Sequence, residues 1–474
     1  MKIYQAEFDF PVVTGHHDLR TYFCGQVAAR LGPDEAPVRF AVTRTDRQSY
    51  HCEIGVLAGW SELPGSDPPP LFEFAPRAPE DAGTFNVALL VPTGIGCEIG
   101  GHAGDAGPIA RLLASVCDRL ITHPNVVNAS DINELPANGL YVEGSILCRL
   151  LQGTVGLRPV RANRVLCVMD AHADVFFEEA VTNAVNAARA SYGLRCPNIV
   201  ALDPPVLLKA RYTSSGMAAG QVDGFERLLA LVRRECGNFD AVALTGVVDV
   251  PPSYRADYFG GGAETVNPWG GIEAIYTHAL SLLFPVPSAH APMLPSKEIA
   301  AFPPGVVDPR MAAEAVSFTY LQCVLKGLQR SPRIFPLEAR SPPPDVLTAA
   351  NVSCLVVPVG ALGLPVLAAL EQGIPVVAVR ENRNVLRNDL AALPWPSGQY
   401  IEVETYLEAV GVLCALKAGL SLEAVRRPLR PAPVMTYPSR TGAGRYPASG
   451  ADGALSSSDS RADRAPAGVE TLSN

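Results

Sequence analysis

The chain of 474 residues lacks any uninterrupted apolar run of about 18 residues, the length that a membrane-spanning helix needs. Its first residues, Met1 to Val13, contain no basic start followed by an apolar stretch, so no secretory signal is expected. Basic side chains are the minority, 38 against 47 acidic ones, and the net charge of −9 argues against a nucleic-acid or anionic-membrane partner. We therefore expect a cytoplasmic protein that binds neither nucleic acid nor membrane.

Closely spaced cysteine pairs are also absent. None of the eleven cysteines has the C-x-x-C spacing of a zinc site or a redox motif, and an odd number does not suit a disulfide framework. Several, such as Cys167 and Cys354, lie inside apolar runs, where a buried reduced thiol is expected. The hydrophobic content of 48% with 18% charged residues is typical of a soluble globular protein with more than one core.

Four ranges of the chain differ in pattern. From residue 86 onward, apolar strand patterns alternate with helical ones, which predicts an α/β fold with a mostly parallel sheet and crossover helices. The tail is poor in aliphatic residues and is expected to be disordered, because it cannot offset its ordering entropy. The ranges are an N-terminal α+β segment (1–80), a main α/β domain (86–340), a second α/β unit packed on or part of the same sheet (345–429), and the tail (430–474).

Within the α/β part, individual elements can be assigned. The apolar stretch 164–169 predicts a strand, and the helical pattern after it should end at Gly193, because glycine favours helix C-termini. The stretch 311–329 has the spacing of one long amphipathic helix.

A glycine-rich loop follows the predicted strand Val87–Val91 and precedes a helix opened by Pro108. Free amides and a helix dipole at such a place favour an anion. No lysine lies near, so nucleotide hydrolysis is not expected. His102 and Asp105, with Glu98 in the same loop, are candidate acid–base residues; the alternative is a purely structural glycine turn. The candidate substrate-binding residues of the loop are Thr93, Gly94, Gly96, Gly100, Gly101 and Gly104.

The string DAHAD at residues 170–174 follows the strand at 164–169. In an extended segment Asp170, His172 and Asp174 share one face, and this donor set suits Mn, Mg or Zn. The string resembles a metal-ligand segment of the arginase-like ureohydrolases. Those enzymes have further metal-ligand segments upstream and downstream, and this chain has only approximate counterparts of them, in GGHAGD and at Asp249. Asp170 and His172 are thus candidates both for metal binding and for catalysis. The alternative is a loop in which Asp174 caps the next helix.

Further polar groups lie on predicted loops. Gly270 and Gly271 begin a helix and form a second candidate anion cradle. Three histidines and one glutamate in the same α/β domain are further candidates for a functional site. The additional candidate substrate-binding residues are Asn125, Asn128 and Asn267, and the remaining titratable ones are His123, Glu273, His278 and His290.

The sequence of the glycine loop and of the helix after it resembles the corresponding segments of a bacterial and plastid family known as domain of unknown function 3326. The segments YVEGSI and NPWGGIEAIYTHAL resemble that family as well. The resemblance covers roughly residues 86 to 425. It implies a single long unit and brings no activity, substrate or catalytic residue. The N-terminal segment and the tail lie outside it.

These features lead to three hypotheses. The first is an enzyme that acts on a small phosphorylated or carboxylated metabolite held by the glycine loop. The second is a divalent-metal hydrolase that uses the DAHAD segment, and the third is a non-catalytic metabolite-binding or assembly protein. The sequence leaves open whether the chain forms a homo-oligomer. Because each follows an apolar strand, we expect the glycine loop and the DAHAD loop to lie at one edge of one sheet and to share a site.

Overall fold

Six short strands form an entirely parallel sheet, called sheet B, in the computed structural model. The strands β4, β17 and β19 are buried along their whole length, as expected for parallel strands covered on both faces. In spatial order the strands are β20 (Tyr400–Val403), β19 (Val376–Val379), β17 (Cys354–Pro358), β4 (Asn86–Leu89), β5 (Arg119–Thr122) and β8 (Gly139–Tyr141).

Ten strands form a second sheet, called sheet A, which is mixed. Its parallel part is β10 (Val165–Asp170), β11 (Ile199–Leu202), β14 (Ala241–Asp249) and β15 (Ser288–Met293), joined on one edge by β12 (Leu207–Tyr212). Its antiparallel part is β13 (Ala218–Asp223), β1 (Lys2–Pro11), β3 (Ser49–Ala58), β2 (Glu35–Thr45) and β18 (Leu362–Gly363). Two further pairs are β9 (Val155–Arg158) with β16 (Arg333–Pro336), and β6 (Asn128–Ala129) with β7 (Ile132–Asn133).

The expected mostly parallel sheet therefore describes sheet B but is wrong for sheet A. The hairpin β12–β13 pairs with β1, and this pairing extends the parallel strands into the antiparallel N-terminal ones. Strands from 86–340 contribute to both sheets, and strands from 345–429 lie beside β4 in sheet B and beside β2 in sheet A. The ranges separated by sequence pattern thus share their sheets, because strands far apart in the sequence pair with one another.

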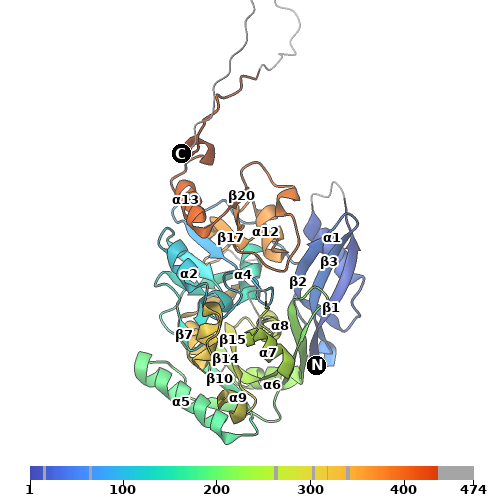
Figure 1. The fold of residues 1–474 in the computed structure, drawn as a ribbon, viewed down its shortest axis with the longest axis vertical. Helices are drawn as coiled ribbons and strands as arrows, with labels where there is room; N and C mark the ends of the chain where they lie inside the picture. Colours follow the sequence, from blue (N-terminus) through green and yellow to red (C-terminus); the bar gives the residue numbers. More distant parts are fainter. Residues whose placement is uncertain are drawn as a thin grey trace, which may run out of the picture. The chain divides into compact units, whose positions relative to one another are not determined.

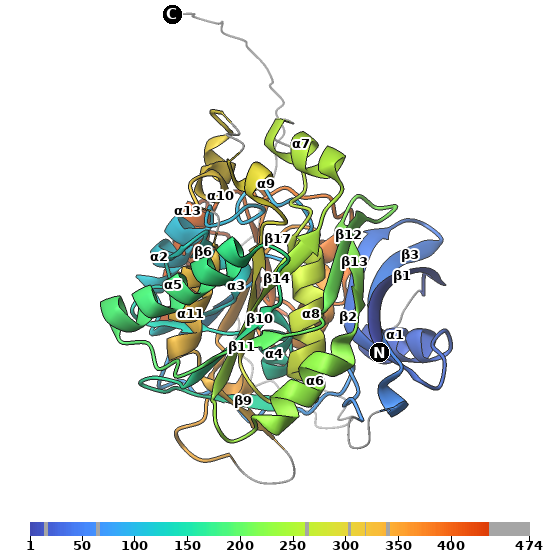
Figure 2. The ribbon, with the colours of Figure 1, turned by 90° about the horizontal axis from the view of Figure 1, so that it is seen from below.

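Helices cover both sheets (Figures 1 and 2). The helix α5 begins after Asp174, whose carboxylate accepts a hydrogen bond from the Phe176 amide, and ends as expected at Gly193, which has a left-handed backbone. The helices of the first half are α1 (Leu19–Ala28), α2 (Gly107–Ala114), α3 (Pro124–Val127), α4 (Gly144–Leu151), α5 (Val175–Tyr192), α6 (Phe225–Arg234) and α7 (Pro252–Gly260). Those of the second half are α8 (Gly270–Leu283), α9 (Lys297–Ala301), α10 (Ala312–Ala315), α11 (Leu321–Arg330), α12 (Leu364–Gln372), α13 (Tyr406–Lys417) and α14 (Leu422–Val425).

The helix α8 lies in the interior, where Figure 2 shows it between the strands of sheet A. It packs on β13, β15 and β2 of sheet A and on α4, the helix that follows strand β8 of sheet B. One of its faces, with Ile272, Ile275 and Ala279 fully buried, joins the apolar core beneath β1, β12 and β14. Its opposite face is thereby directed toward the strand ends of sheet B.

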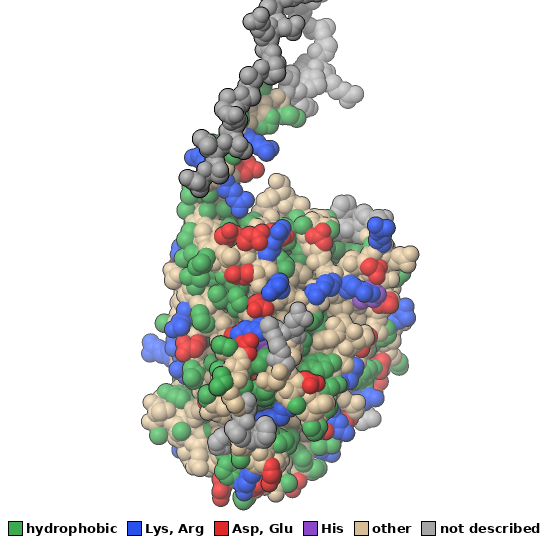
Figure 3. Space-filling view, in the orientation of Figure 1, with side chains coloured by type: hydrophobic (Ala, Val, Ile, Leu, Met, Phe, Trp, Pro, Cys, Tyr) green, Lys and Arg blue, Asp and Glu red, His purple; other side chains and the backbone are tan. Residues whose placement is uncertain are grey.

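The structure describes residues 1–13, 18–62, 67–260, 265–301, 305–317, 319–337 and 342–435. Residues 1–425 form one compact unit and residues 426–474 a second. In the second unit, the described residues 426–435 are exposed and carry neither helix nor strand, and the rest of the expected disordered tail lies outside the described residues. Acidic and basic side chains are interspersed over the face of the first unit seen in Figure 3. Over the described ranges, no helix is both long and apolar enough to cross a membrane.

Candidate active site

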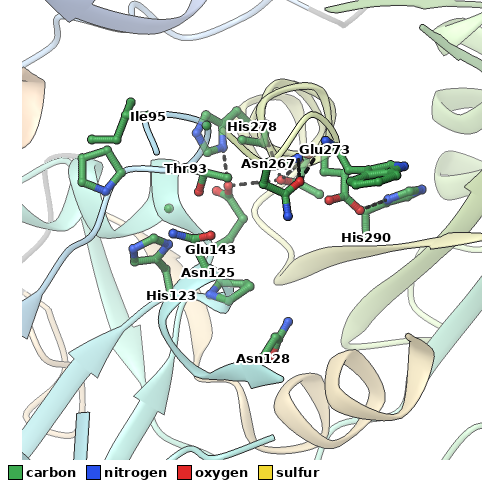
Figure 4. Close-up of a pocket in the computed structure, with 18 of the residues that line it drawn as sticks. Thr93, Ile95, His123, Asn125, Asn128, Glu143, Asn267, Glu273, His278 and His290 are labelled. Atoms are coloured by element: carbon green, nitrogen blue, oxygen red, sulfur yellow. Dashed lines mark hydrogen bonds and ion pairs between the residues drawn. The ribbon is translucent and has the colours of Figure 1, made fainter. Parts of the chain in front are cut away.

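A cavity of about 300 Å³ lies where the carboxyl ends of sheet B meet α8 and β15 (Figure 4). The residues directly after β4, β5 and β8 line it, including Thr93, His123 and Glu143. The other walls come from α8, β15, the glycine loop and β2 of the N-terminal segment. Carboxyl ends of parallel strands are the usual place for ligands in such sheets, and the volume is at the small end of the range of small-molecule sites, about 300–1,000 Å³.

The buried Glu143 and the half-buried His278 form an acid–imidazole pair in this cavity. Glu143 precedes α4, and one of its oxygens caps the helix by accepting hydrogen bonds from the Ser145 amide at 3.0 Å and the Ile146 amide at 3.3 Å. The other oxygen is bonded to Nδ1 of His278. Burial alone would raise the pKa of Glu143, but His278 and the hydrogen-bond donors together hold it below its usual value. Glu143 is therefore an ionised carboxylate that orients the His278 ring.

His123 lies on the opposite wall and is held in one tautomer. The Val91 amide donates to its Nε2 at 3.1 Å, so the proton of the neutral ring is on Nδ1. Burial lowers the pKa of His123 to about 4, which keeps the ring neutral at physiological pH. Asn125 supports the same corner by donating to the carbonyls of Val91 at 3.0 Å and Gly100 at 2.8 Å.

A second acid–imidazole pair links α8 to sheet A. Nδ1 of His290, on β15, lies 2.8 Å from Oε1 of Glu273, on α8. His290 is almost fully buried, and its Nε2 has no hydrogen-bond partner among the described residues. Figure 4 shows both pairs lining the cavity. The helix α8 thus supplies one member of each pair, Glu273 and His278.

A buried polar network closes the cavity beside the glycine loop. Nδ1 of His102 lies 2.8 Å from the Tyr258 hydroxyl, which donates to Glu314 at 3.0 Å. The same Glu314 oxygen accepts from Asn267 at 3.0 Å and from the Ala103 amide at 2.8 Å. Burial lowers the pKa of His102 to about 4 and raises the pKa of Glu314 to about 7. The network holds the loop against α7, α8 and α10.

Several amides of the glycine loop are bonded within the protein, namely those of Glu98, Ile99, Gly100, His102 and Ala103. The carboxylate of Asp105 accepts from the amides of Gly100 at 2.9 Å and His102 at 3.2 Å, and burial raises its pKa to about 6. Gly104 has a left-handed backbone and lies against Ala129, where a Cβ would overlap the alanine side chain. Asp105 and Gly104 therefore shape the loop, and neither lines the cavity.

The candidate residues from sequence divide into two groups. Those that line the cavity are Thr93, Gly94, Gly101, His102, Asn125, Asn128, Asn267 and Gly270. Those that do not are Gly96, Gly100, Gly104, Asp105, Gly271, Asp170, His172 and Asp174. At the second candidate anion cradle, the side-chain oxygen of Asn267 accepts from the amides of Trp269 and Gly270, so the Gly270 amide is bonded within the protein. Gly271 instead allows close packing on the carbonyl of Ala218.

The DAHAD side chains do not converge. Asp170 accepts from the Val206 amide at 3.0 Å, and burial raises its pKa to about 6. His172 accepts the Asp174 amide on Nδ1 and lies 3.2 Å from the Leu294 carbonyl through Nε2, so both ring nitrogens are used. Asp174 caps α5 and pairs with Lys297. This donor set does not fit a divalent ion, and in the described part of the chain no three His, Cys, Asp or Glu side chains form a metal-binding group.

The glycine loop and the DAHAD loop also follow strands of different sheets, so the expectation that they share an edge is wrong. The cavity is built instead with residues that sequence reasoning left as dispersed, namely His123, Glu273, His278 and His290. Glu143, Glu314 and Arg39 were missed. A signal existed for Glu143, which follows an apolar strand and directly precedes a predicted helix, where the helix dipole favours a carboxylate.

Comparison with known proteins agrees with the resemblance found in the sequence. Residues 86–426 match the family described as protein of unknown function (DUF3326). A Synechococcus sp. (strain ATCC 27144 / PCC 6301 / SAUG 1402/1) protein described as an uncharacterized lipoprotein is 38% identical over 345 residues, covering 71% of this chain and 92% of that protein. No solved structure matches the chain. Because the family match covers well over half of the chain, this chain belongs to the DUF3326 family.

Proposed function

We propose that this protein is an enzyme that catalyses proton transfer on a small anionic metabolite bound in the cavity. The observation that carries the proposal is the pairing of Glu143 with His278 at the strand ends of sheet B. A carboxylate bonded to Nδ1 fixes the imidazole and stabilises the imidazolium that forms when Nε2 takes a proton.

His278 has the arrangement that a general base requires. Its Nε2 makes no hydrogen bond within the described residues, and its side chain retains 16% of its exposure in a cavity wall. The backbone of Gly144 lies beside the ring, since a Cβ there would be 3.2 Å from Cε1 of His278. A substrate C–H or O–H placed at Nε2 would give up its proton to His278, and Glu143 would balance the resulting charge.

His123 supplies the complementary group. Its neutral ring presents the Nδ1 proton, which a developing oxyanion can accept without a proton leaving the imidazole. The two rings together provide a base and a fixed hydrogen-bond donor in one partly enclosed cavity. Proton abstraction next to a carbonyl or carboxylate is the reaction class that such a pair supports.

The test is solvent exchange. A panel of carboxylated and phosphorylated metabolites is incubated with the protein in D₂O, and the loss of individual C–H signals is followed by NMR. We expect exchange into at least one compound with wild-type protein and none above background with His278→Asn. Ligand-induced thermal stabilisation without exchange or turnover would instead support the non-catalytic metabolite-binding hypothesis.

The cellular location stays a prediction. The Synechococcus relative is described as a lipoprotein, whereas the sequence of this chain predicts a cytoplasmic protein. Proton-transfer chemistry in the cavity is compatible with either location.

A further inference from the structure

The cavity has two chemically different ends. The end described above carries the histidines and carboxylates. The other end, called the apolar end, is formed where β2 meets β18, the start of α12 and the residues after β4. Residues no more than 9% exposed line it, namely Leu71, Leu90, Leu362, Leu364 and Leu386. An apolar surface of this kind adds affinity for the hydrocarbon part of a ligand.

Arg39 is the charged side chain that β2 places in this part of the cavity wall. Its Nη2 donates to the Thr93 carbonyl at 3.0 Å, which fixes the guanidinium. Its Nη1 is buried and has no hydrogen-bond partner among the described residues. Burial lowers the pKa of Arg39, yet a guanidinium stays charged in proteins.

No carboxylate of the described chain neutralises Arg39 by an ion pair. The acid whose charge acts on it most is Glu53, on the neighbouring strand. The oxygens of Glu53 already accept from Gln5 at 3.0 Å, Thr213 at 2.6 Å and Ser215. Buried cations are normally paired, so the free Nη1 is the group that a ligand oxyanion would complete.

We propose that the cavity binds an amphipathic carboxylate, with the carboxylate on Arg39 and the apolar body in the apolar end. The assignment rests on the proposed function of the same cavity and names its substrate class. One guanidinium balances the single charge of a carboxylate, whereas a phosphate dianion would leave surplus charge among apolar side chains. The other arginine of the lining, Arg255, packs on the rings of Phe259 and Trp269.

The N-terminal segment would therefore decide specificity. Arg39 and Phe40 precede residue 86, where the family match begins. Pairing of Ala41 with Gly363 and Val42 with Leu362 places this segment beside the apolar residues of β18. The family-matched part supplies the histidines, and the segment before it supplies the cation.

The experiment measures calorimetric Kd values of the full chain for straight-chain carboxylic acids of about four to about ten carbons, with the matching alcohols and alkyl phosphates. We expect affinity to rise about threefold to fourfold per methylene until the apolar end is filled, the equivalent of about 0.8 kcal/mol each. The acids should bind at least about tenfold more tightly than the alcohols. Arg39→Met should abolish that preference and keep the chain-length dependence.

Arg44→Met is the control, because Arg44 lies on the same strand with an exposed side chain and does not line the cavity. Equal binding of acids and alcohols by wild-type protein, affinity independent of chain length, or an unchanged acid preference in Arg39→Met would each overturn the proposal. Tighter binding of alkyl phosphates would overturn the carboxylate assignment. Binding needs no turnover, so absence of solvent exchange with acid binding intact would refute the proposed enzyme and leave this inference standing.

Discussion

The two carboxylate oxygens of Glu143 have different roles, one in the fold and one in the proposed proton transfer. One oxygen caps α4 and the other orients His278. A neutral amide in this position can still accept from the α4 amides, but its NH₂ group would then face Nδ1 of His278 and favour the wrong tautomer.

Glu143→Gln is therefore expected to lower the solvent-exchange rate by about 10²- to 10⁴-fold while the protein stays folded. The measurement is the NMR exchange rate together with the thermal unfolding midpoint. Glu179→Gln, on the exposed surface of α5, should change neither quantity. Full activity in Glu143→Gln would remove the pair from the mechanism.

His123 makes the stability of the protein depend on pH. Because its folded pKa is about 4 and the usual histidine value is 6.5, the folded state binds fewer protons between these values. Its contribution to stability is present above pH 6.5 and is lost as the pH falls toward 4, on the order of 3 kcal/mol in total.

In His123→Gln, which can still accept from the Val91 amide, this loss should be absent. Urea unfolding at pH 7.5 and 4.5 measures it: the free energy of unfolding should fall more for wild-type protein than for the variant. The other titrating groups, including Asp105 and Asp170, contribute equally to both proteins and cancel in the comparison. Parallel pH profiles would contradict the assigned neutral state of His123.

At the scale of elements, the glycine loop is a rigid turn between β4 and α2. Gly104→Ala is expected to destabilise the protein by about 2–4 kcal/mol, because it adds left-handed strain to an overlap with Ala129. Gly216 has a similar φ of +83° but open space around it, so its alanine variant measures the backbone strain without the overlap. Its alanine variant should lose only about 1–2 kcal/mol in the same chemical unfolding experiment. Equal losses would show that the contact with Ala129 is unimportant.

The helix expected over 311–329 is divided in the structure. The helix α10 ends at Ala315, α11 begins at Leu321, and Tyr320 between them has a left-handed backbone. Asp131 accounts for the break: its carboxylate accepts from the Ser317 and Thr319 hydroxyls and from the Gln322 amide. The contacts of Asp131 thus replace a helical turn, although the amphipathic spacing of this stretch suits a continuous helix. The break leaves Glu314 of α10 in the cavity wall.

At the scale of the whole molecule, the N-terminal segment is part of the fold of residues 1–425. The strand β1 covers the edge of β13, Gly55 lies against Ile275 of α8, and Val38 belongs to the same apolar core as Ile275. A fragment of residues 86–426 would expose this edge and the apolar face of α8.

We therefore expect the 86–426 fragment to be insoluble or to unfold without a cooperative transition, as measured by circular dichroism and calorimetry. Removal of residues 430–474 is the matched truncation. It should leave the melting temperature unchanged, because that stretch is poor in aliphatic residues. A cooperatively folded 86–426 fragment would show that the family-matched region is an independent domain.

The sequence alone determined the features that depend on local chemistry. Apolar runs identified the buried strands around Val87–Val91 and 164–169, and glycine chemistry identified the end of α5 at Gly193. The sequence of the glycine loop identified the family, and residues of that loop line the cavity. These features rest on backbone conformation and hydrophobic periodicity, which neighbouring residues decide.

Only the tertiary structure decided which strand ends share a site. Glu143 and His278 lie 135 positions apart, and Arg39 reaches the cavity from a strand that precedes the family-matched region. The DAHAD segment has a plausible donor pattern, but its side chains bond to Val206, Leu294 and the start of α5. Strand order, sheet pairing and the position of α8 between the strands of sheet A set these distances, and local residue patterns carry no information about them.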